Sequence, residues 1–141
     1  MTLLSWSNQY LIGDDAIDAE HKELFRLIND FHSHWLEAHD RQTIARVFNQ
    51  LIVYAETHFR HEEKIMEEHC FPKLAEHKEV HEAMVETIFQ LHRSYMEGNS
   101  HLEVNTMKFV KSWLIDHILE NDYRFRDFLA RSRSIAESTA Q

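Results

Sequence analysis

The sequence predicts an all-α protein, an up-down-up-down antiparallel four-helix bundle with an N-terminal arm. The chain of 141 residues contains two glycines and one proline, so it is poor in turn formers and rich in helix formers. Over four long segments, apolar residues recur at spacings of three and four, which is the period of an amphipathic helix. The connections between these segments are short, which favours antiparallel neighbours within a single domain over residues 1–141.

Residues 1–18 carry apolar side chains without a helical period, and we expect them to form an ordered arm that packs across the bundle. Asp18 is the expected N-cap of the first helix, because its side chain can accept a hydrogen bond from the first turn. This helix should run to about Glu37. Its apolar stripe consists of Leu24, Ile28, Phe31 and Trp35. His21 lies on the same stripe, three residues before Leu24.

Cap and turn residues predict the bounds of the next helices. Asp40 is the expected N-cap of the second helix, which should end near His69. Pro72 suits the first turn of the third helix, where its missing N–H costs nothing. Gly98 is expected to end that helix in a left-handed conformation. A capping box at residues 100–103 then opens the fourth helix.

The fourth helix is expected to run to about Arg131, before a frayed polar tail over residues 132–141. His117 lies on its apolar stripe, and Asp122 follows five residues later. Five residues correspond to about 140° of rotation on an α-helix, so the two side chains would diverge. If both face one point, the helix must widen locally. We therefore predict a π-bulge between Trp113 and Asp122.

Charge and composition exclude several classes of partner. Fifteen basic residues against 24 acidic ones give a net charge of −9, which argues against a nucleic acid and against an anionic membrane surface. No apolar run of 18 residues exists, so no membrane-spanning helix is expected. The chain start shows no secretory signal and Cys70 is the only cysteine, so we expect a cytoplasmic protein. No exposed apolar stripe stands out, and we expect a monomer rather than an oligomer.

Polar side chains interrupt the apolar stripes of all four helices at matching depths. Two pairs, His58 with Glu62 and then His77 with His81, lie four residues apart and so share a helix face. A lone histidine on an apolar stripe is more often a hydrogen-bonded core residue, but that explanation fails for six stripe positions together. We therefore predict a metal site. Its candidate ligands are His21, His58, Glu62, His77, His81, His117 and Asp122.

The types of ligand restrict the metal. Imidazole with carboxylate suits iron, zinc, copper or nickel, and the lack of thiolates disfavours a structural zinc site. Seven ligands are too many for one ion. Two ions bridged by the two carboxylates would divide the five histidines as three and two. With a bridging oxygen, one metal would have six ligands and the other five, which leaves one position open for a small molecule.

Two neighbours of these candidates are set aside. Glu62 is preferred to Glu63 as a ligand because it lies four residues after His58. His61 is expected on a solvated face. Besides the five candidate ligands and His61, the sequence has six more histidines. They have no helical relation to the candidate set, and we expect them at the surface.

Four segments in order carry a resemblance to a known family. They are Ile17-Asp-Ala-Glu-His-Lys22, His58-Phe-Arg-His-Glu-Glu63, His77-x-x-x-His81 and Trp113-Leu-Ile-Asp-His-Ile-Leu-Glu-Asn-Asp122. From Trp6 to about Leu129 the chain is similar to the hemerythrins, and specifically to the single-domain bacteriohemerythrins. The resemblance implies reversible O2 binding at two non-haem iron ions that share a bridging oxo or hydroxo group.

The resemblance also divides the ligands into a three-histidine site, a two-histidine site and two bridges. These are, in that order, His77, His81 and His117; His21 and His58; Glu62 and Asp122. It implies that O2 binds at the two-histidine site, inside an apolar pocket that keeps water and protons from displacing the bound oxygen. The candidate lining is Leu24, Ile28, Phe59, Trp113, Leu114 and Ile118. Ordinary core packing explains these six residues too, and the two interpretations are compatible.

Other classes of function remain open. The alternative is a di-iron enzyme or redox protein that reduces peroxide or nitric oxide, or a protein of iron storage or sensing. Ferritin-like enzymes use paired Glu-x-x-His motifs, and this sequence contains none, so we expect no enzyme. The sequence does not separate O2 storage from delivery or sensing, and it leaves open whether another protein accepts the O2.

Overall fold

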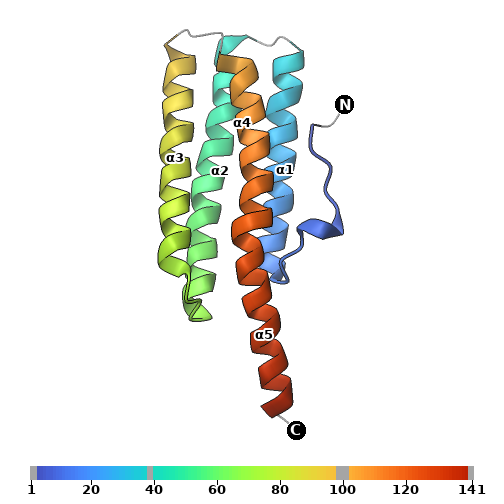
Figure 1. Cartoon of the computed structure of the whole chain (residues 1–141). Coiled ribbons are helices and arrows are strands. Elements are labelled where there is room, and N and C mark those ends of the chain that lie inside the picture. Colours follow the sequence, from blue (N-terminus) through green and yellow to red (C-terminus); the bar gives the residue numbers. More distant parts are fainter. Residues whose placement is uncertain (1–2, 38–39, 98–101, 140–141) are drawn as a thin grey trace.

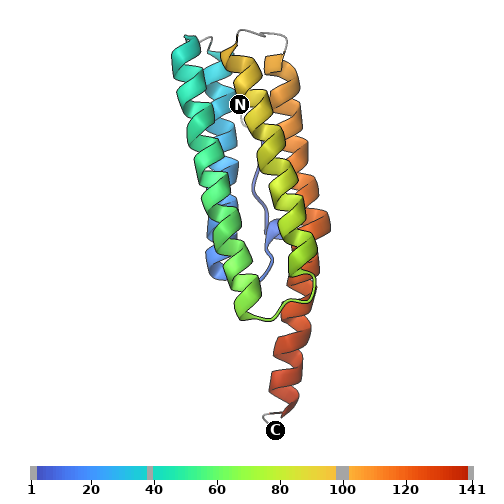
Figure 2. The same cartoon turned by 90° about the vertical axis from the view of Figure 1, so that its left-hand side faces the viewer.

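Four segments with helical apolar spacing form the helices of an antiparallel bundle, as predicted. The structure, a computed structural model, describes residues 3–37, 40–97 and 102–139, and for residues 102–107 and 138–139 it describes the backbone alone. The helical elements of the bundle are α1 (Asp15–Leu36), α2 (Arg41–Glu68), α3 (Leu74–Met96), α4 (Leu102–Asp116), the short segment η2 (His117–Asp122) and α5 (Tyr123–Thr139). The last three run end to end as one helix, and α5 projects beyond the bundle (Figures 1 and 2).

The first helix begins one turn earlier than predicted. Its N-cap is Asp14, whose carboxylate accepts the N–H of Ile17 at 3.0 Å. The prediction of Asp18 as the cap was therefore wrong. Asp18 lies in the first turn, and its carboxylate accepts the N–H groups of Ile12 at 2.8 Å and Gly13 at 3.3 Å. These two hydrogen bonds attach the arm to the helix. The chain turns at Gly13, whose φ of 97° is a conformation that glycine adopts without strain.

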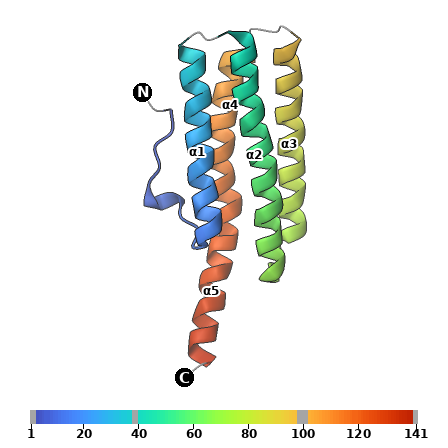
Figure 3. The same ribbon diagram turned by 180° about the vertical axis from the view of Figure 1, so that it is seen from behind.

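The N-terminal arm, residues 3–14, lies alongside α1 (Figures 1 and 3). It contains a short 3-10 turn, η1 (Asn8–Tyr10). Asn29 of α1 holds the start of the arm, since its side chain accepts the N–H of Leu4 at 2.8 Å and donates to the carbonyl of Leu4 at 2.9 Å. The arm is ordered and packed, and it ends at Asp14 rather than at the expected residue 18.

The third helix begins later than predicted. Asp40 caps α2 as expected, accepting the N–H of Thr43 at 2.9 Å. Pro72, however, lies in a turn before α3, which begins at Leu74. The turn starts at Cys70, which adopts a left-handed φ of 55°, so the chain leaves α2 before it reaches the proline. The expected helix end at Gly98 and the capping box at residues 100–103 lie outside the described side chains.

The fourth helix ends later than predicted. It continues to Thr139, where the sequence analysis expects an end near Arg131 and a frayed tail over residues 132–141. No glycine or proline follows Arg131, so nothing in this stretch stops a helix. Arg133 also donates a hydrogen bond to the carbonyl of Gly13 at 2.9 Å, which attaches α5 to the arm.

Apolar layers enclose a polar layer inside the bundle. Along α2, Phe59 belongs to a central apolar cluster, and Ile65 and Met66 belong to another near the α2–α3 turn. The buried polar residue Glu62 lies between them in sequence. Among the described residues, no helix has both the length and the apolar character that a membrane span requires.

Candidate metal centre

All seven predicted ligands are buried inside the bundle. Each of the seven residues is at most 4% exposed, and His21 and Glu62 are 0% exposed. They come from α1, α2, α3 and η2, so each helix of the bundle contributes. Burial of so many ionisable groups is costly unless they are paired or bind a cation.

The fourth helix widens where the sequence analysis predicts it. Residues His117–Asp122 form η2, a π-helical segment, and the N–H of Tyr123 after it bonds to the carbonyl of Ile118, five residues back. The widened turn holds one more residue than an α-helical turn. His117 and Asp122 therefore face the same point, and their Nε2 and Oδ1 atoms lie 3.2 Å apart.

Five ligand atoms converge at the three-histidine site. Oε1 of Glu62 lies 2.6 Å from Nε2 of His77 and 3.3 Å from Nε2 of His81. Nε2 of His81 lies 3.1 Å from Nε2 of His117. Oδ1 of Asp122 lies 3.2 Å from Nε2 of both His77 and His117. Four of these residues, all except Asp122, have ligand atoms that lie within 4.8 Å of one another, close enough to share one metal ion.

Four ligand atoms converge at the two-histidine site next to it. Oε2 of Glu62 lies 3.3 Å from Nε2 of His21 and 3.1 Å from Nε2 of His58. Oδ2 of Asp122 lies 3.2 Å from Nε2 of His21. Each carboxylate therefore directs one oxygen atom to each site, which is the arrangement of a bridging ligand.

These distances fit a metal better than hydrogen bonds. Two ligands at right angles on a metal with bonds of about 2.1 Å lie about 3 Å apart, close to most of the separations here. Both carboxylate oxygens of Asp122 lie within ion-pair distance of imidazoles, yet neither accepts a hydrogen bond. A buried carboxylate without a hydrogen bond is destabilising by at least about 1–3 kcal/mol. A bound cation between the converging atoms would remove that cost.

The charges of the site also favour a cation. Burial would lower the pKa of His21, but Asp122 and Glu62 raise it to about 9. Burial likewise opposes the proton on His77, and the same two carboxylates raise the pKa of His77 to about 10. Burial would raise the pKa of Glu62, but the surrounding imidazoles hold it well below its ordinary value. In the metal-free chain, protons thus occupy the place of the metal.

Two further carboxylates support the ligand histidines from behind. Glu20 accepts the Nδ1–H of His58 at 2.8 Å, and Glu63 accepts the Nδ1–H of His81 at 2.9 Å. Burial would raise the pKa of each carboxyl, but these histidines and their neighbours lower it, so both are anionic. His61 is exposed, as expected, but it also donates to Glu20, at 2.7 Å.

Sequence reasoning missed these supporting contacts. Glu20 directly precedes His21, but its partners lie on α2, and spacing within one helix does not reveal a contact between two helices. Glu63, which the sequence analysis sets aside as a bridge, contacts Nδ1 of His81, whereas Nε2 of that histidine faces the other candidate ligands. Chemistry could have suggested such contacts, because metal-bound histidines commonly donate their second N–H to a carboxylate.

The six residues predicted to line the O2 pocket lie together. Five of them belong to one buried cluster, and Trp113 packs against that cluster. These five are Leu24, Ile28, Phe59, Leu114 and Ile118. Phe59 stacks on His81 with ring centroids 4.1 Å apart, and Trp113 lies parallel to His117 at 5.9 Å. These two aromatic rings therefore cover the three-histidine site, a role that the sequence analysis does not predict.

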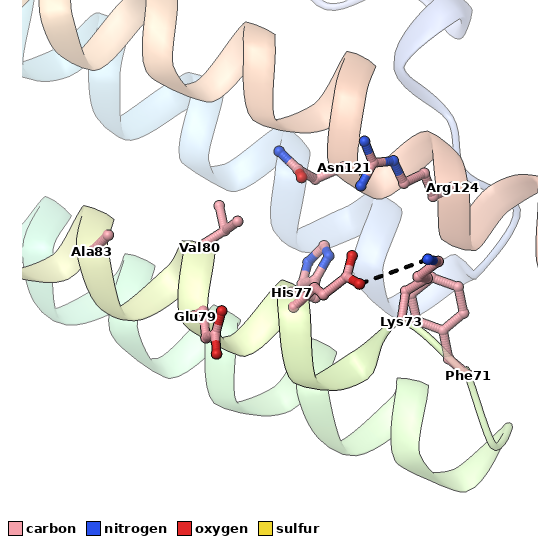
Figure 4. Close-up of a pocket in the computed structure, with 9 residues that line it drawn as sticks. Phe71, Lys73, His77, Glu79, Val80, Ala83, Asn121 and Arg124 are labelled. Carbon is pink, nitrogen blue, oxygen red and sulfur yellow. Dashed lines mark ion pairs between the residues drawn. The ribbon is translucent and has the colours of Figure 1, made fainter.

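Surface grooves approach the three-histidine site. His77 borders a groove of about 340 Å³, in which Asn121 and Arg124 of the fourth helix lie opposite α3 and Lys73 lies at one end (Figure 4). His117 borders a second groove of about 380 Å³. Neither groove is lined by His21 or His58, so the two-histidine site lies away from both.

Comparison with known proteins gives a consistent result. The chain is 30% identical to a bacteriohemerythrin of Stenotrophomonas maltophilia over 90% of this chain and 82% of that protein. It is 27% identical to a myohemerythrin of Theromyzon tessulatum, covering 86% and 89% of the two chains. The fold is similar to the crystal structure of a hemerythrin point mutant, with a TM-score of 0.81, 26% identity, and coverage of 90% and 97%. Residues 12–129 match the profile of the hemerythrin HHE cation binding domain. The chain belongs to the hemerythrin family.

Proposed function

We propose that the protein binds O2 reversibly at a non-haem di-iron centre whose ligands are the seven buried polar residues. Oxygen binding at such a centre is the function of the hemerythrin family, and the predicted function and cofactor agree with the family match and with the cluster. One observation carries the ligand assignment. Two adjacent groups of ligand atoms share both carboxylates, and one group has five protein donors where the other has four.

The difference in donor number supports the two-histidine site as the place of O2 binding. When bound, the two ferrous ions would supply the electrons that hold the oxygen. His21 and His58 would orient the metal from one side, leaving a position free that the three-histidine site lacks. The apolar side chains of the buried cluster, Leu24 and Ile118 among them, would exclude the water and protons that convert a reversible carrier into an oxidised, inert form.

The ligand chemistry supports binding rather than turnover. Five neutral imidazoles and two carboxylates place little negative charge on the metals, which stabilises the ferric state less than a carboxylate-rich set does. Such a centre favours release of O2 over oxidation of a substrate. We therefore place the protein among oxygen-binding proteins rather than enzymes, and a monomer remains the prediction.

Iron loading and spectroscopy test this function. Metal-free protein is titrated with ferrous iron without air, and its visible spectrum is followed through cycles of air and deoxygenation. We expect two irons per chain and a charge-transfer band that appears and bleaches repeatedly. A single irreversible oxidation, or fewer than two irons per chain, would contradict the proposal. As a matched control, Glu67→Gln removes an exposed charge from α2 and should change neither result.

A further inference from the structure

A three-residue hydrogen-bonded chain links the two-histidine site to the surface. The two carboxylate oxygens of Glu20 each accept one N–H, Oε1 from Nδ1 of His58 at 2.8 Å and Oε2 from Nδ1 of His61 at 2.7 Å. The side chain of His58 is 1% exposed, that of Glu20 is 23% exposed and that of His61 is 43% exposed. The contact crosses from α1 to α2, directly beside His21.

The chemistry of Glu20 determines which nitrogen of His58 can bind a metal. An ionised carboxylate only accepts hydrogen bonds, so Nδ1 of His58 must carry the hydrogen. The lone pair is then left on Nε2, which points inward and lies 3.1 Å from Oε2 of Glu62. An amide at position 20 could instead donate to Nδ1, which would place the hydrogen on Nε2 and block the metal.

His61 restrains the carboxylate itself. A partly exposed glutamate on a helix surface can rotate into water, and each such rotamer removes the acceptor from His58. By holding the second oxygen, His61 limits that motion and keeps Glu20 against α2. His61 lies three residues after His58 on α2, so both histidines present Nδ1 to the same carboxylate from neighbouring turns.

We propose that Glu20 and His61 form a clamp that positions His58 and sets the iron affinity of the two-histidine site separately from that of the three-histidine site. The inference rests on the proposed di-iron function. It assigns Glu20 and His61 as positioning residues, since they act on the metal through His58.

The three-histidine site has a supporting carboxylate of its own, Glu63, so the effect of Glu20 should be confined to the two-histidine site. Glu63 accepts the Nδ1–H of His81 at 2.9 Å, and Arg60 lies 3.4 Å from its other oxygen. Each carboxylate thus orients one ligand of one site. The two-histidine site has fewer protein donors, so misorientation of one imidazole removes a larger share of its ligands.

Ferrous iron alone is the probe. Metal-free wild type, Glu20→Gln and Glu63→Gln are titrated without air against a coloured chelator. Loss of a partner behind a metal-bound histidine typically weakens metal affinity about 10- to 100-fold. We expect that loss for one of the two ions in Glu20→Gln. His61→Ala should give a smaller loss, because Glu20 keeps its direct contact with His58. Glu67→Gln is the matched control and should bind both ions as the wild type does.

A variant that lacks a proposed ligand shows which of the two sites Glu20→Gln weakens. In His21→Ala the remaining tightly bound ion should occupy the three-histidine site. Adding Glu20→Gln to this background should leave the affinity of that ion unchanged, whereas adding Glu63→Gln should weaken it about 10- to 100-fold. Equal weakening of both ions by Glu20→Gln, or wild-type affinity for both, would overturn the clamp.

Two further results separate the possible failures. Thermal unfolding of the metal-free variants tests a general loss of structure, and a large drop for Glu20→Gln without metal would contradict a role in positioning. The wild-type titration tests the proposed function itself. If the wild type binds two ions and cycles with O2 while Glu20→Gln behaves identically, the clamp fails and the proposed function stands.

Discussion

The metal-free protein should lose stability as the pH rises from 7 to 9. Burial opposes protonation of His21 and His77, but Asp122 and Glu62 raise the pKa of His21 to about 9 and that of His77 to about 10. A histidine whose pKa is higher in the folded chain stabilises the fold fully below its unfolded pKa of about 6.5. That stabilisation is lost as the pH rises through the folded-state pKa.

The size of the effect follows from the two pKa values. One pKa unit corresponds to about 1.4 kcal/mol. Between pH 7 and 9, a folded-state pKa of about 10 implies a loss of about 2.5 kcal/mol for His77, and a value of about 9 implies a loss of about 2 kcal/mol for His21. Glu62 and Asp122, whose pKa values are lowered, stay ionised throughout. The sum, about 4.5 kcal/mol, is a large share of the roughly 5–15 kcal/mol that stabilises a typical domain.

Urea unfolding of chelator-treated protein at pH 7, 8 and 9 measures this slope. His77→Ala should reduce the slope by about half. His69→Ala, which removes an exposed histidine at the C-terminal end of α2, is the control and should leave it unchanged. The iron-loaded protein should show little slope, because its ligand nitrogens hold metal instead of protons. A metal-free stability that stays flat or rises between pH 7 and 9 would refute the reasoning.

Three other outcomes follow from the same geometry. His77→Ala should lose iron from the three-histidine site, and a variant that retains both irons would contradict the ligand assignment. Ile118→Ala should destabilise the fold by about 2–4 kcal/mol in urea unfolding and speed irreversible oxidation of the loaded protein, because it opens the apolar cluster to water. An unchanged oxidation rate would argue against a protective pocket. Asp14→Ala should cost about 1 kcal/mol through the lost N-cap, and Asp15→Ala, its neighbour without that bond, should cost less.

The fold and the convergence of the seven polar side chains could be predicted because both depend on spacing along single helices. His58 and Glu62, four residues apart on an apolar stripe, had to face the bundle interior. The five-residue separation of His117 and Asp122 was equally informative, because two residues that share a site cannot be 140° apart, and η2 widens the helix there.

The remaining features depend on competition or on contacts between helices. Asp14 and Asp18 both suit an N-cap. The carboxylate of Asp18 instead accepts the N–H groups of Ile12 and Gly13 in the arm, which leaves Asp14 as the cap. Pro72 is compatible with a first turn, but Cys70 had already turned the chain. The pairing of Glu20 with His58 joins two helices whose relative rotation the sequence does not state.

The central claim is reversible binding of O2, and measurement of O2 uptake and release tests it most directly. Protein loaded with ferrous iron is equilibrated with a known amount of O2, and the gas is then removed and quantified over repeated cycles. We expect uptake of one O2 molecule for each pair of irons and recovery of the same amount as O2 in every cycle. Uptake without recovery, with the oxygen reduced to water or peroxide, would contradict it.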